Sequence, residues 1–404
     1  MSKVLNFLFL VADRFPTYRP DIQSLFGDQI AVKGHSVSLV TQSREPLKFS
    51  HATKWHCMDV TVTPNVEGIS LFSKIKRHLL SFFNDIVCLF KGISRELDFV
   101  QIKDKFLLAL IALPLCKAKQ VPLYYWLSFS IPEEQIYKAT NGETKYPRLL
   151  LLRGYFFSFV LYKIISKYCD HIFVQSVEMM NDFVKHSVQP SKITPVPMGV
   201  NMSDVPNSTV GNPFQYVYIG AMDRSRHLEF LLLVHLKVLQ TNPEAKLFMV
   251  GSSFHEDDVV YLKNEAMRLG LSESVIFTGF VPREKAWQIV HESHICLSPM
   301  HPSPMLRTTT PTKCMEYMAL GKPVVGNIEV PDMKYVLEAS GGGVCVPWSV
   351  DDFASAINYL LCNPKKSSEM GANGRDWIAK NRDYSIIAND LLAVYQNLRQ
   401  QTNR

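Results

Sequence analysis

The sequence lacks the residue spacings that hold metal ions or redox centres in many proteins. Its eight cysteines contain no C-x-x-C pair, its twelve histidines form no H-E-x-x-H pattern, and no Asp-x-Asp occurs anywhere. These absences disfavour a zinc ribbon, a thioredoxin-type site and a disulfide scaffold. The sequence therefore predicts neither a bound metal ion nor a cofactor.

Runs of like charge and unbroken apolar segments are also missing. No run of five or six like charges and no basic-aromatic repeat occurs, so nucleic acid is not an expected partner. Residues 106–116 are apolar but too few to span a bilayer, and residues 149–165 are interrupted by Arg153 and Lys163. The N-terminal apolar run stops at Asp13 without a small-residue cleavage site, which predicts a first strand rather than a signal peptide.

The chain has the length and composition of a globular protein with two or three domains. It has 404 residues, of which 47% are hydrophobic and 20% charged. Short apolar runs alternate with helical patterns from end to end, which predicts an α/β fold with parallel, doubly wound sheets. A stretch rich in Pro, Gly and Asn between Pro195 and Pro213 indicates a linker. We therefore expect two Rossmann-like domains that face each other across a cleft. The expected strands are residues 5–11, 37–41, 99–102, 123–127 and 171–174, then 216–219, 246–250, 275–277, 295–297, 323–325 and 343–346.

Charge is distributed unevenly along the chain. Residues 1–203 contain 24 Lys and Arg against 16 Asp and Glu, a net of +8, whereas the remainder has a net of −2. A basic first half suits anionic lipid or a phosphorylated acceptor. Within it, residues 73–91 place apolar side chains at helical spacing beside four basic ones, the pattern of a basic amphipathic helix. Such a helix either lies on a membrane surface or packs on its own domain.

The segment from Thr308 to Asn327, TTTPTKCMEYMALGKPVVGN, has the features of an anion-binding helix. Thr310 suits the N-cap and Pro311 the first helical position, so the helix should present free N–H groups to a phosphate. Lys313 is a cation in the first turn, where it opposes the helix dipole, which indicates an anion nearby. Glu316 follows one turn later and can accept bonds from both hydroxyls of a ribose. The alternative is a capped helix with a solvated Glu.

Residues 311–325 match the pattern P-x-K-x-x-E-Y-M-A-x-G-K-P-V-V, which resembles the donor-binding segment of GT-B glycosyltransferases of family 4, which are retaining enzymes. The resemblance extends over residues 217–232, 245–253 and 275–299. In the first half, residues 100–134 and 171–180 are similar to bacterial members that build surface polysaccharides. The resemblance implies an acceptor domain at 1–203, a nucleotide-sugar domain at 204–382 and a last helix within 383–404 that returns to the first domain.

The resemblance also assigns roles in donor binding. Glu316 matches the second Glu of the family's E-x7-E motif, which holds the donor ribose, but the first position of that motif is Thr308. Arg224 and Arg226 follow a strand where family members place a basic pair on the donor diphosphate, although the spacing is not the usual one. The loop 279–282 resembles the pocket for the nucleotide base. The donor-binding positions implied are Arg224, Arg226, Gly279, Phe280, Val281, Thr308, Thr310, Thr312, Lys313 and Glu316.

The first half should supply the acceptor side. The loop 13–21 lacks the family's Gly pair, and the region of Trp126 to Ser128 lacks its usual His. Asp104 ends a strand between two lysines, a position that suits a cleft or, equally, a solvated turn. The catalytic candidates are Arg224, Arg226, Glu316 and Asp104. The acceptor-side candidates are Arg14, Arg19, Asp21, Lys103 and Lys105.

These patterns predict an enzyme that moves a sugar, with retention and without metal, from a nucleotide diphosphate sugar to a hydroxyl. The acceptor implied is a lipid-linked glycan in surface polysaccharide synthesis, reached from the cytoplasmic face of the membrane. One alternative is an inverting GT-B transferase or a nucleotide-sugar epimerase, with Asp104 or Asp21 as base. The other is a non-catalytic nucleotide-sugar binder or partner subunit, which the departure at Thr308 and the missing His would explain.

Overall fold

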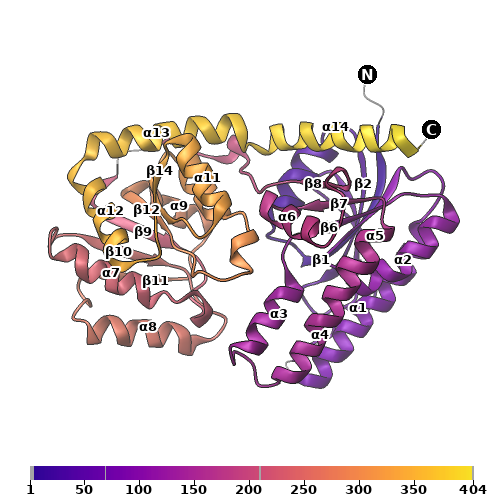
Figure 1. The fold of residues 1–404 in the computed structure, drawn as a ribbon, viewed down its shortest axis with the longest axis horizontal. Coiled ribbons are helices and arrows are strands. Elements are labelled where there is room, and N and C mark those ends of the chain that lie inside the picture. The colour runs from indigo at the N-terminus through magenta and orange to yellow at the C-terminus, as the bar shows by residue number, and fades with distance from the viewer. Residues whose placement is uncertain (1–3, 69, 209–210, 403–404) are drawn as a thin grey trace. The chain divides into compact units, whose positions relative to one another are not determined.

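The computed structural model describes residues 4–68, 70–208 and 211–402. The chain divides into two compact units, which we describe separately (Figure 1). The first unit consists of Met1–Pro197 and Tyr384–Arg404, and the second of Met198–Asp383. Each unit is a sheet with helices on both faces, so the predicted α/β fold with two parallel-sheet domains is confirmed.

The first unit is built on an eight-stranded sheet of order β3-β4-β2-β1-β5-β6-β7-β8. Neighbouring strands are parallel except β3 and β4, which pair antiparallel at one edge. The strands are β1 (Asn6–Phe15), β2 (Ser36–Ser43), β3 (His51–Trp55), β4 (Met58–Thr63), β5 (Phe99–Lys103), β6 (Leu123–Leu127), β7 (His171–Val174) and β8 (Ile193–Pro195). The helices are η1 (Asp21–Ala31), α1 (Leu71–Gly92), α2 (Phe106–Lys119), α3 (Ile131–Thr140), α4 (Pro147–Phe159), η2 (Val160–Ile165), α5 (Ser166–Tyr168), α6 (Val177–Lys185), η3 (Pro190–Lys192) and α14 (Tyr384–Thr402).

Alternate side chains of β1 enter two different cores. Leu8 and Leu10 join the apolar cluster that includes α2 and η2, whereas Phe7 and Phe9 join the cluster that includes η1 and α14. The last helix is therefore part of the first unit's core. Its Tyr395 is fully buried and donates a hydrogen bond to Gln101 of β5, at 2.6 Å between the oxygens.

The second unit is built on a six-stranded parallel sheet of order β11-β10-β9-β12-β13-β14. Its strands are β9 (Asn212–Ile219), β10 (Lys246–Val250), β11 (Val275–Gly279), β12 (Ser293–Ser298), β13 (Val324–Asn327) and β14 (Gly343–Val346). Its helices are η4 (Met202–Asp204), η5 (Arg224–Arg226), α7 (Glu229–Leu239), α8 (Glu256–Arg268), α9 (Arg283–Glu292), η6 (Leu306–Thr308), α10 (Thr312–Ala319), α11 (Pro331–Ser340), α12 (Val350–Cys362) and α13 (Pro364–Asn381).

The strand order of each sheet indicates where a ligand-binding site is expected. In the second sheet, β9 lies between β10 and β12, so the chain runs outward to β11 and then crosses back to β12. In the first sheet, β1 likewise lies between β2 and β5. Ligands of open α/β sheets bind at the carboxyl ends of the strands beside such a switch. The ends of β9 and β10, and of β1 and β5, are therefore where functional side chains are sought.

Candidate active site

At the carboxyl edge of the second sheet, three strands are each followed by a glycine or end in one. Gly220 follows β9, Gly251 follows β10, and Gly279 ends β11. A Cβ on Gly251 would overlap the carbonyl oxygen of Gly220, and a Cβ on Gly220 would overlap the ammonium group of Lys313. These glycines let neighbouring turns approach each other closely, and they leave room for Lys313 at the edge of the sheet.

Lys313 lies in the first turn of α10 and contacts Tyr218 of β9. Its Nζ donates a hydrogen bond to the Tyr218 hydroxyl at 3.3 Å and lies 4.6 Å from the centre of that ring. Burial and then the positive charge of Arg226 lower the pKa of Lys313 to about 7, against the raising effects of Glu316 and Asp223. Two cations therefore crowd one edge of the sheet, an arrangement that an anion such as a diphosphate stabilises.

Glu316 lies on α10, three residues beyond Lys313. Burial raises the pKa of its carboxyl group, whereas the charges of Arg283 and Lys313 lower it. Within the described part of the chain, no side chain donates a hydrogen bond to this carboxylate. Both oxygens are thus able to accept hydrogen bonds from a ligand, such as the two hydroxyls of a ribose.

The helix itself is anchored by a residue that the sequence did not single out. The backbone N–H of Ile219, the last residue of β9, donates to the hydroxyl of Tyr317 at 2.8 Å. Tyr317 follows Glu316 directly and is almost fully buried. This bond ties α10 to the end of β9 and so fixes Glu316 and Lys313 relative to Tyr218. The signal was present in the sequence as a Tyr beside Glu316, but only the fold reveals its partner.

The start of α10 differs from the prediction. The helix begins at Thr312, Pro311 occupies the N-cap position, and no side chain caps the helix there. The prediction of Thr310 as N-cap and Pro311 as first helical residue was therefore wrong. Thr308 and Thr310 are both buried, and the Thr308 hydroxyl donates to the carbonyl of Met305 at 3.0 Å. Pro311 has a ψ of 95°, outside the helical region, so the helix begins only at the next residue.

The two arginines predicted as a pair point to different partners. The guanidinium of Arg224 lies 3.8 Å from the ring centre of Tyr261 on α8, and its Nε lies 3.7 Å from a carboxylate oxygen of Asp258. Arg226 lies near Lys313 and only loosely beside Asp223, at 3.9 Å. The structure therefore brings Arg226 together with Lys313 and Glu316, and it turns Arg224 toward α8.

The loop that follows β11 is open. Gly279 has a φ of +70°, a conformation that favours glycine, and a Cβ there would meet no atom within 4 Å. Phe280 is 84% exposed, and Val281 is half-buried. An exposed aromatic ring on an open loop is able to stack on a planar ligand such as a nucleotide base.

Several acceptor-side candidates of the first unit form a buried ion network. Lys103, which ends β5, is fully buried and lies 2.7 Å from Asp13 and 2.9 Å from Asp21. Arg19 lies 3.2 Å from Asp21, and these two cations lower the pKa of that carboxyl far below its usual value. The network joins the end of β5 to β1 and to the start of η1. Lys103, Asp21 and Arg19 thus hold the edge of the sheet together.

Asp104, the next residue, faces a cavity of about 330 Å³ in the first unit. Its carboxylate accepts hydrogen bonds from the backbone N–H and the hydroxyl of Ser128. Burial raises its pKa to about 6, against the lowering effects of Lys103 and Ser128. Arg14 and Lys105, both predicted, line the same cavity. The sequence did not point to three further lining residues, His78, Asp85 and Arg153, because they come from helices distant in the chain.

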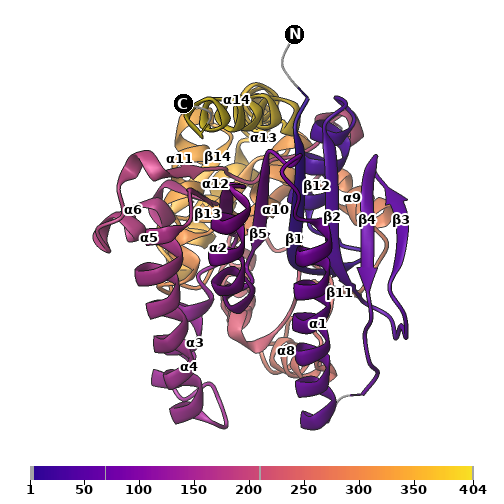
Figure 2. The same ribbon diagram turned by 90° about the vertical axis from the view of Figure 1, so that its right-hand side faces the viewer.

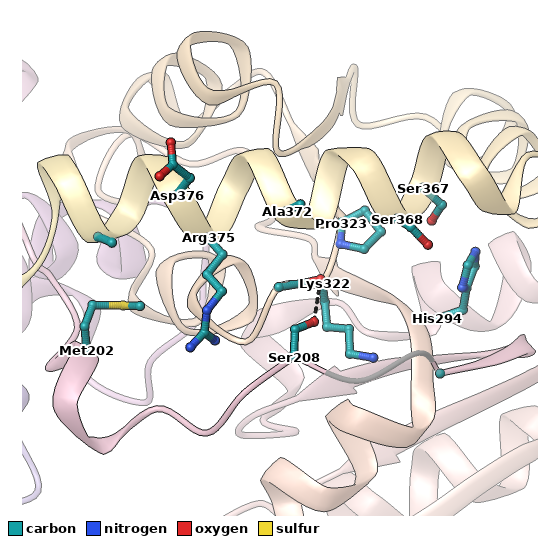
Figure 3. A pocket seen from close by; sticks show the side chains of 13 residues that line it. Met202, Ser208, His294, Lys322, Pro323, Ser367, Ser368, Ala372, Arg375 and Asp376 are labelled. Carbon is teal, nitrogen blue, oxygen red and sulfur yellow. Dashed lines mark hydrogen bonds between the residues drawn. The ribbon is translucent and has the colours of Figure 1, made fainter.

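The second unit also contains a cavity of about 450 Å³ at the opposite edge of its sheet (Figure 3). It is lined by Ser208, Lys322, Arg375 and, at the start of β12, His294. The guanidinium of Arg375 donates to the carbonyls of Pro206 and Ala319, and Lys322 donates to a backbone carbonyl of α9. These cations therefore cap backbone carbonyls, and the cavity lies at the amino ends of the strands, away from Lys313 and Glu316.

Comparison with known proteins shows which proteins this chain resembles. Residues 204–377 match the family described as glycosyl transferases group 1. The chain is 30% identical over 138 residues to the alpha-1,3/1,6-mannosyltransferase ALG2 of Dictyostelium discoideum, a match over 34% of this chain and 31% of that protein. It is 26% identical over 146 residues to the GDP-mannose-dependent alpha-(1-6)-phosphatidylinositol monomannoside mannosyltransferase of Mycolicibacterium smegmatis, over 34% of this chain and 36% of that one. The matches thus span about a third of each relative.

Solved structures extend the similarity of fold to nearly the whole chain. Anabaena HepE in complex with UDP and glucose has 16% identity and a TM-score of 0.69, over 96% of this chain and 99% of that one. Sucrose-phosphate synthase from Thermosynechococcus elongatus has 16% identity and a TM-score of 0.72, over 98% and 100%. WaaG, a glycosyltransferase involved in lipopolysaccharide biosynthesis, has 15% identity and a TM-score of 0.68, over 96% and 99%. The chain therefore has the GT-B fold, and its residues 204–377 match the family described as glycosyl transferases group 1.

Proposed function

We propose that the protein transfers a sugar from a nucleotide diphosphate sugar to a hydroxyl of a lipid-linked glycan, with retention at the anomeric carbon and without metal. The observation that carries the donor half is the group of Lys313, Arg226 and Glu316 at the carboxyl edge of the second sheet. A diphosphate bound beside the two cations would have its charge neutralised as it leaves the sugar. Glu316 would hold the ribose, and the loop at Phe280 would meet the base.

The relatives support a nucleotide-sugar donor. Two similar proteins are named as mannosyltransferases, one of them GDP-mannose-dependent, and HepE was solved with UDP and glucose. These names do not assign the base or the sugar of this chain. The direct test is to incubate the purified protein with a panel of nucleotide diphosphate sugars and measure release of the nucleotide diphosphate. Lys313→Met should abolish the release, and Glu316→Gln should slow it. Release unaffected by both changes would contradict the assignment of the donor site.

Asp104 supports a second candidate, an inverting transferase that uses a carboxylate base. With a pKa of about 6, this carboxylate is mostly ionised at neutral pH and is basic enough to accept a proton from a hydroxyl. The inverting mechanism predicts that turnover rises as pH increases through 6 and that Asp104→Asn loses both this limb and most of the rate. The retaining mechanism predicts a product with the donor's anomeric configuration. Proton NMR of the product therefore decides between the two.

Independence from metal is tested with a chelator. Because Arg226, Lys313 and the start of α10 can together offset a diphosphate, we expect turnover to be unchanged after dialysis against EDTA. The measurement is nucleotide release before chelation, after chelation and after magnesium is restored. Loss of turnover that magnesium rescues would overturn the metal-independent mechanism.

We also propose that the first unit works at an anionic membrane surface, on the cytoplasmic side. The apolar stripe of α1 is exposed to solvent: Phe72, Ile75, Leu79, Phe83, Val87 and Phe90 are each 47–76% exposed. The outer face of α4 is similar, with Leu149, Leu152, Tyr155, Phe156 and Phe159 between 49% and 69% exposed. Both helices extend from the same end of the first sheet (Figures 1 and 2). Basic side chains beside such faces suit anionic lipid.

The run Pro147–Tyr168, formed by α4, η2 and α5, is long and apolar enough to cross a membrane by length and composition, although a third of its most apolar window is buried. It also carries Arg153 and Lys163, and Gly154 of α4 packs against Ile136 of α3. A helix packed along one side and charged at intervals suits the surface of a bilayer better than its interior.

Vesicle sedimentation tests the membrane proposal. A double Lys74→Glu, Lys76→Glu protein should bind anionic vesicles about thirtyfold more weakly or worse, because each basic residue near such a surface contributes about 1 kcal/mol. Both lysines are exposed, whereas Arg77 donates to the carbonyls of Val66 and Gly68 and is left unchanged. Lys117→Glu, Lys119→Glu on α2 gives a control with the same change in net charge. Equal loss in both proteins would mean that only total charge matters, and absence of binding by the wild type would remove the proposal.

A further inference from the structure

The cavity of the first unit brings several cations together. It lies beyond the ends of β1 and β5, and Arg14, His78 and Arg153 line it from β1, α1 and α4. Arg14 and Arg153 form no ion pair with any carboxylate of residues 4–68, 70–208 and 211–402. Burial, followed by the charges of Arg77 and Arg44, lowers the pKa of Arg14. Burial also lowers the pKa of His78, followed by the charges of Arg153, Arg14 and Arg77.

The carboxylates of the cavity do not offset these cations. Asp85 pairs with Lys105, at 2.6 Å between Oδ2 and Nζ, so that these two charges cancel. Asp104 is held by Ser128. Arg14 and Arg153 therefore line the cavity without an ion-pair partner among the described residues, and a bound anion pairs with such groups. Phosphate is the anion whose geometry suits guanidinium groups best.

The remaining wall of the cavity is aromatic and apolar. Phe82, Phe106, Leu107 and Phe157 line it, and the rings of Phe106 and Phe157 stack with their centres 5.1 Å apart. Leu107 is 43% exposed. Phe106 and Leu107 belong to α2, whereas Phe82 belongs to α1 and Phe157 to α4, the two helices whose outer faces are exposed and apolar. A ligand that fits both parts is charged at one end and hydrocarbon at the other.

We propose that this cavity binds the phosphate end of an amphiphile, namely a phosphate or diphosphate that carries a long hydrocarbon chain. The proposal rests on the proposed function, in which this amphiphile is the carrier of the acceptor glycan. Arg14 and Arg153 bind the phosphate oxygens, and the chain lies along the aromatic wall. Asp85 has one carboxylate oxygen that is buried and has no hydrogen-bond partner within the described residues. That oxygen accepts a hydroxyl of the sugar attached to the phosphate.

The test measures binding of simple probes to the whole chain by titration calorimetry. The probes are octyl and decyl phosphate below their micelle concentrations, inorganic phosphate, and decyl glucoside as a neutral amphiphile. Decyl phosphate should bind more tightly than the other probes, and affinity should rise about threefold for each added methylene. Equal affinity for inorganic phosphate and decyl phosphate would overturn the proposal, because the aromatic wall would then contribute nothing to binding. Equal affinity for decyl glucoside and decyl phosphate would also overturn the proposal, because the charge of the phosphate would then contribute nothing.

Variants separate this site from general charge effects. Arg14→Gln and Arg153→Gln should each weaken decyl phosphate binding about tenfold or more, the effect of losing a charge-assisted hydrogen bond. Arg148→Gln removes an exposed arginine of the same helix α4 that does not line the cavity, and it should bind like the wild type. Thermal unfolding checks that each variant is folded, and Arg14→Lys, which keeps the charge, should retain part of the affinity. Equal affinity in Arg14→Gln, Arg153→Gln and Arg148→Gln would overturn the proposal.

The donor site gives an independent readout in the same proteins. Release of the nucleotide diphosphate from sugar donors is measured for the wild type and for each of these variants. If the protein binds decyl phosphate through Arg14 and Arg153 but releases no nucleotide from any sugar donor, the proposed transferase activity fails while the phosphate site stands. If donors are turned over while decyl phosphate does not bind, the phosphate site fails alone.

Discussion

The Glu316→Ala protein should bind the donor nucleotide a hundredfold or more weakly than the wild type. The wild-type side chain is half-buried and has no hydrogen-bond donor among the side chains that the structure describes, so its carboxylate oxygens are available to a ligand. Two ribose hydroxyls bonded to one carboxylate contribute on the order of 1.5–3 kcal/mol each, and both are lost in Glu316→Ala. Glu316→Gln keeps one acceptor oxygen and should lose less. Titration calorimetry with the nucleotide diphosphate that the wild type prefers measures both effects.

The ribose itself provides the control for Glu316. A 2′,3′-dideoxy nucleotide diphosphate should bind the wild type and Glu316→Ala about equally, because neither complex contains the hydroxyl contacts. Glu284→Gln, at an exposed carboxylate of α9, should bind both nucleotides as the wild type does. If Glu316→Ala still discriminates against the dideoxy nucleotide as strongly as the wild type, another group holds the ribose.

Removal of the Glu316 charge should not destabilise the fold. Burial raises the pKa of this carboxyl group above its value in the unfolded chain, so the folded state loses stability as pH rises through the raised pKa. Glu316→Gln avoids this loss and should melt at the same temperature as the wild type or higher at pH 8. A binding defect together with unchanged or higher stability is the signature of a residue kept for its ligand.

Nucleotide diphosphate affinity should fall steeply above pH 7 because of Lys313. The pKa of this lysine is lowered to about 7, so the unliganded protein is about half protonated there at neutral pH. A bound diphosphate favours the charged form and raises the pKa, so that binding takes up protons. Once pH exceeds 7, each further unit should weaken binding by up to about tenfold, until the pKa of the complex is reached. Calorimetry in buffers with different ionisation heats measures the proton uptake directly.

Two variants test whether Lys313 is the group that titrates. Lys313→Met should bind far more weakly at pH 7 and show no pH dependence between 7 and 9. Gly220→Ala keeps the lysine but displaces its ammonium group, because the new Cβ would overlap it. This variant should lose affinity as well, although no charge has been removed. A pH dependence that persists in Lys313→Met would assign the titration to a different group.

The regular parts of the fold were predictable because they depend on local patterns. Each predicted strand is present, since the buried strands of parallel sheets are short, continuous apolar runs. The strands that were missed are β3, β4 and β8. β3 has the sequence HATKW and is largely exposed, β4 has the alternating sequence MDVTVT, and β8 has three residues. None of them is a continuous apolar run.

The site was predictable only where a motif covers it. Lys313 and Glu316 lie on one helix, so their spacing placed them together in advance. Arg224 and Arg226 are equivalent in the sequence, and only the positions of Tyr261 and Lys313 separate them. The lining of the cavity in the first unit comes from β1, β2, the turn after β5 and four helices. Tertiary packing brings these lining residues together, and their spacing along the chain does not predict that they are neighbours.

The placement of α14 has a consequence for the order in which the protein is made. The first unit needs Tyr395, which packs among Phe99, Tyr124 and Phe173 beneath the sheet. During translation, residues 1–197 leave the ribosome long before these partners are covered, whereas the second unit, Met198–Asp383, is one continuous segment. The second unit can therefore complete its core first. Until α14 is synthesised, the aromatic residues on one face of the first sheet remain exposed to solvent. A chain that stops before Tyr384 would keep that face exposed and become a substrate for chaperones and proteases.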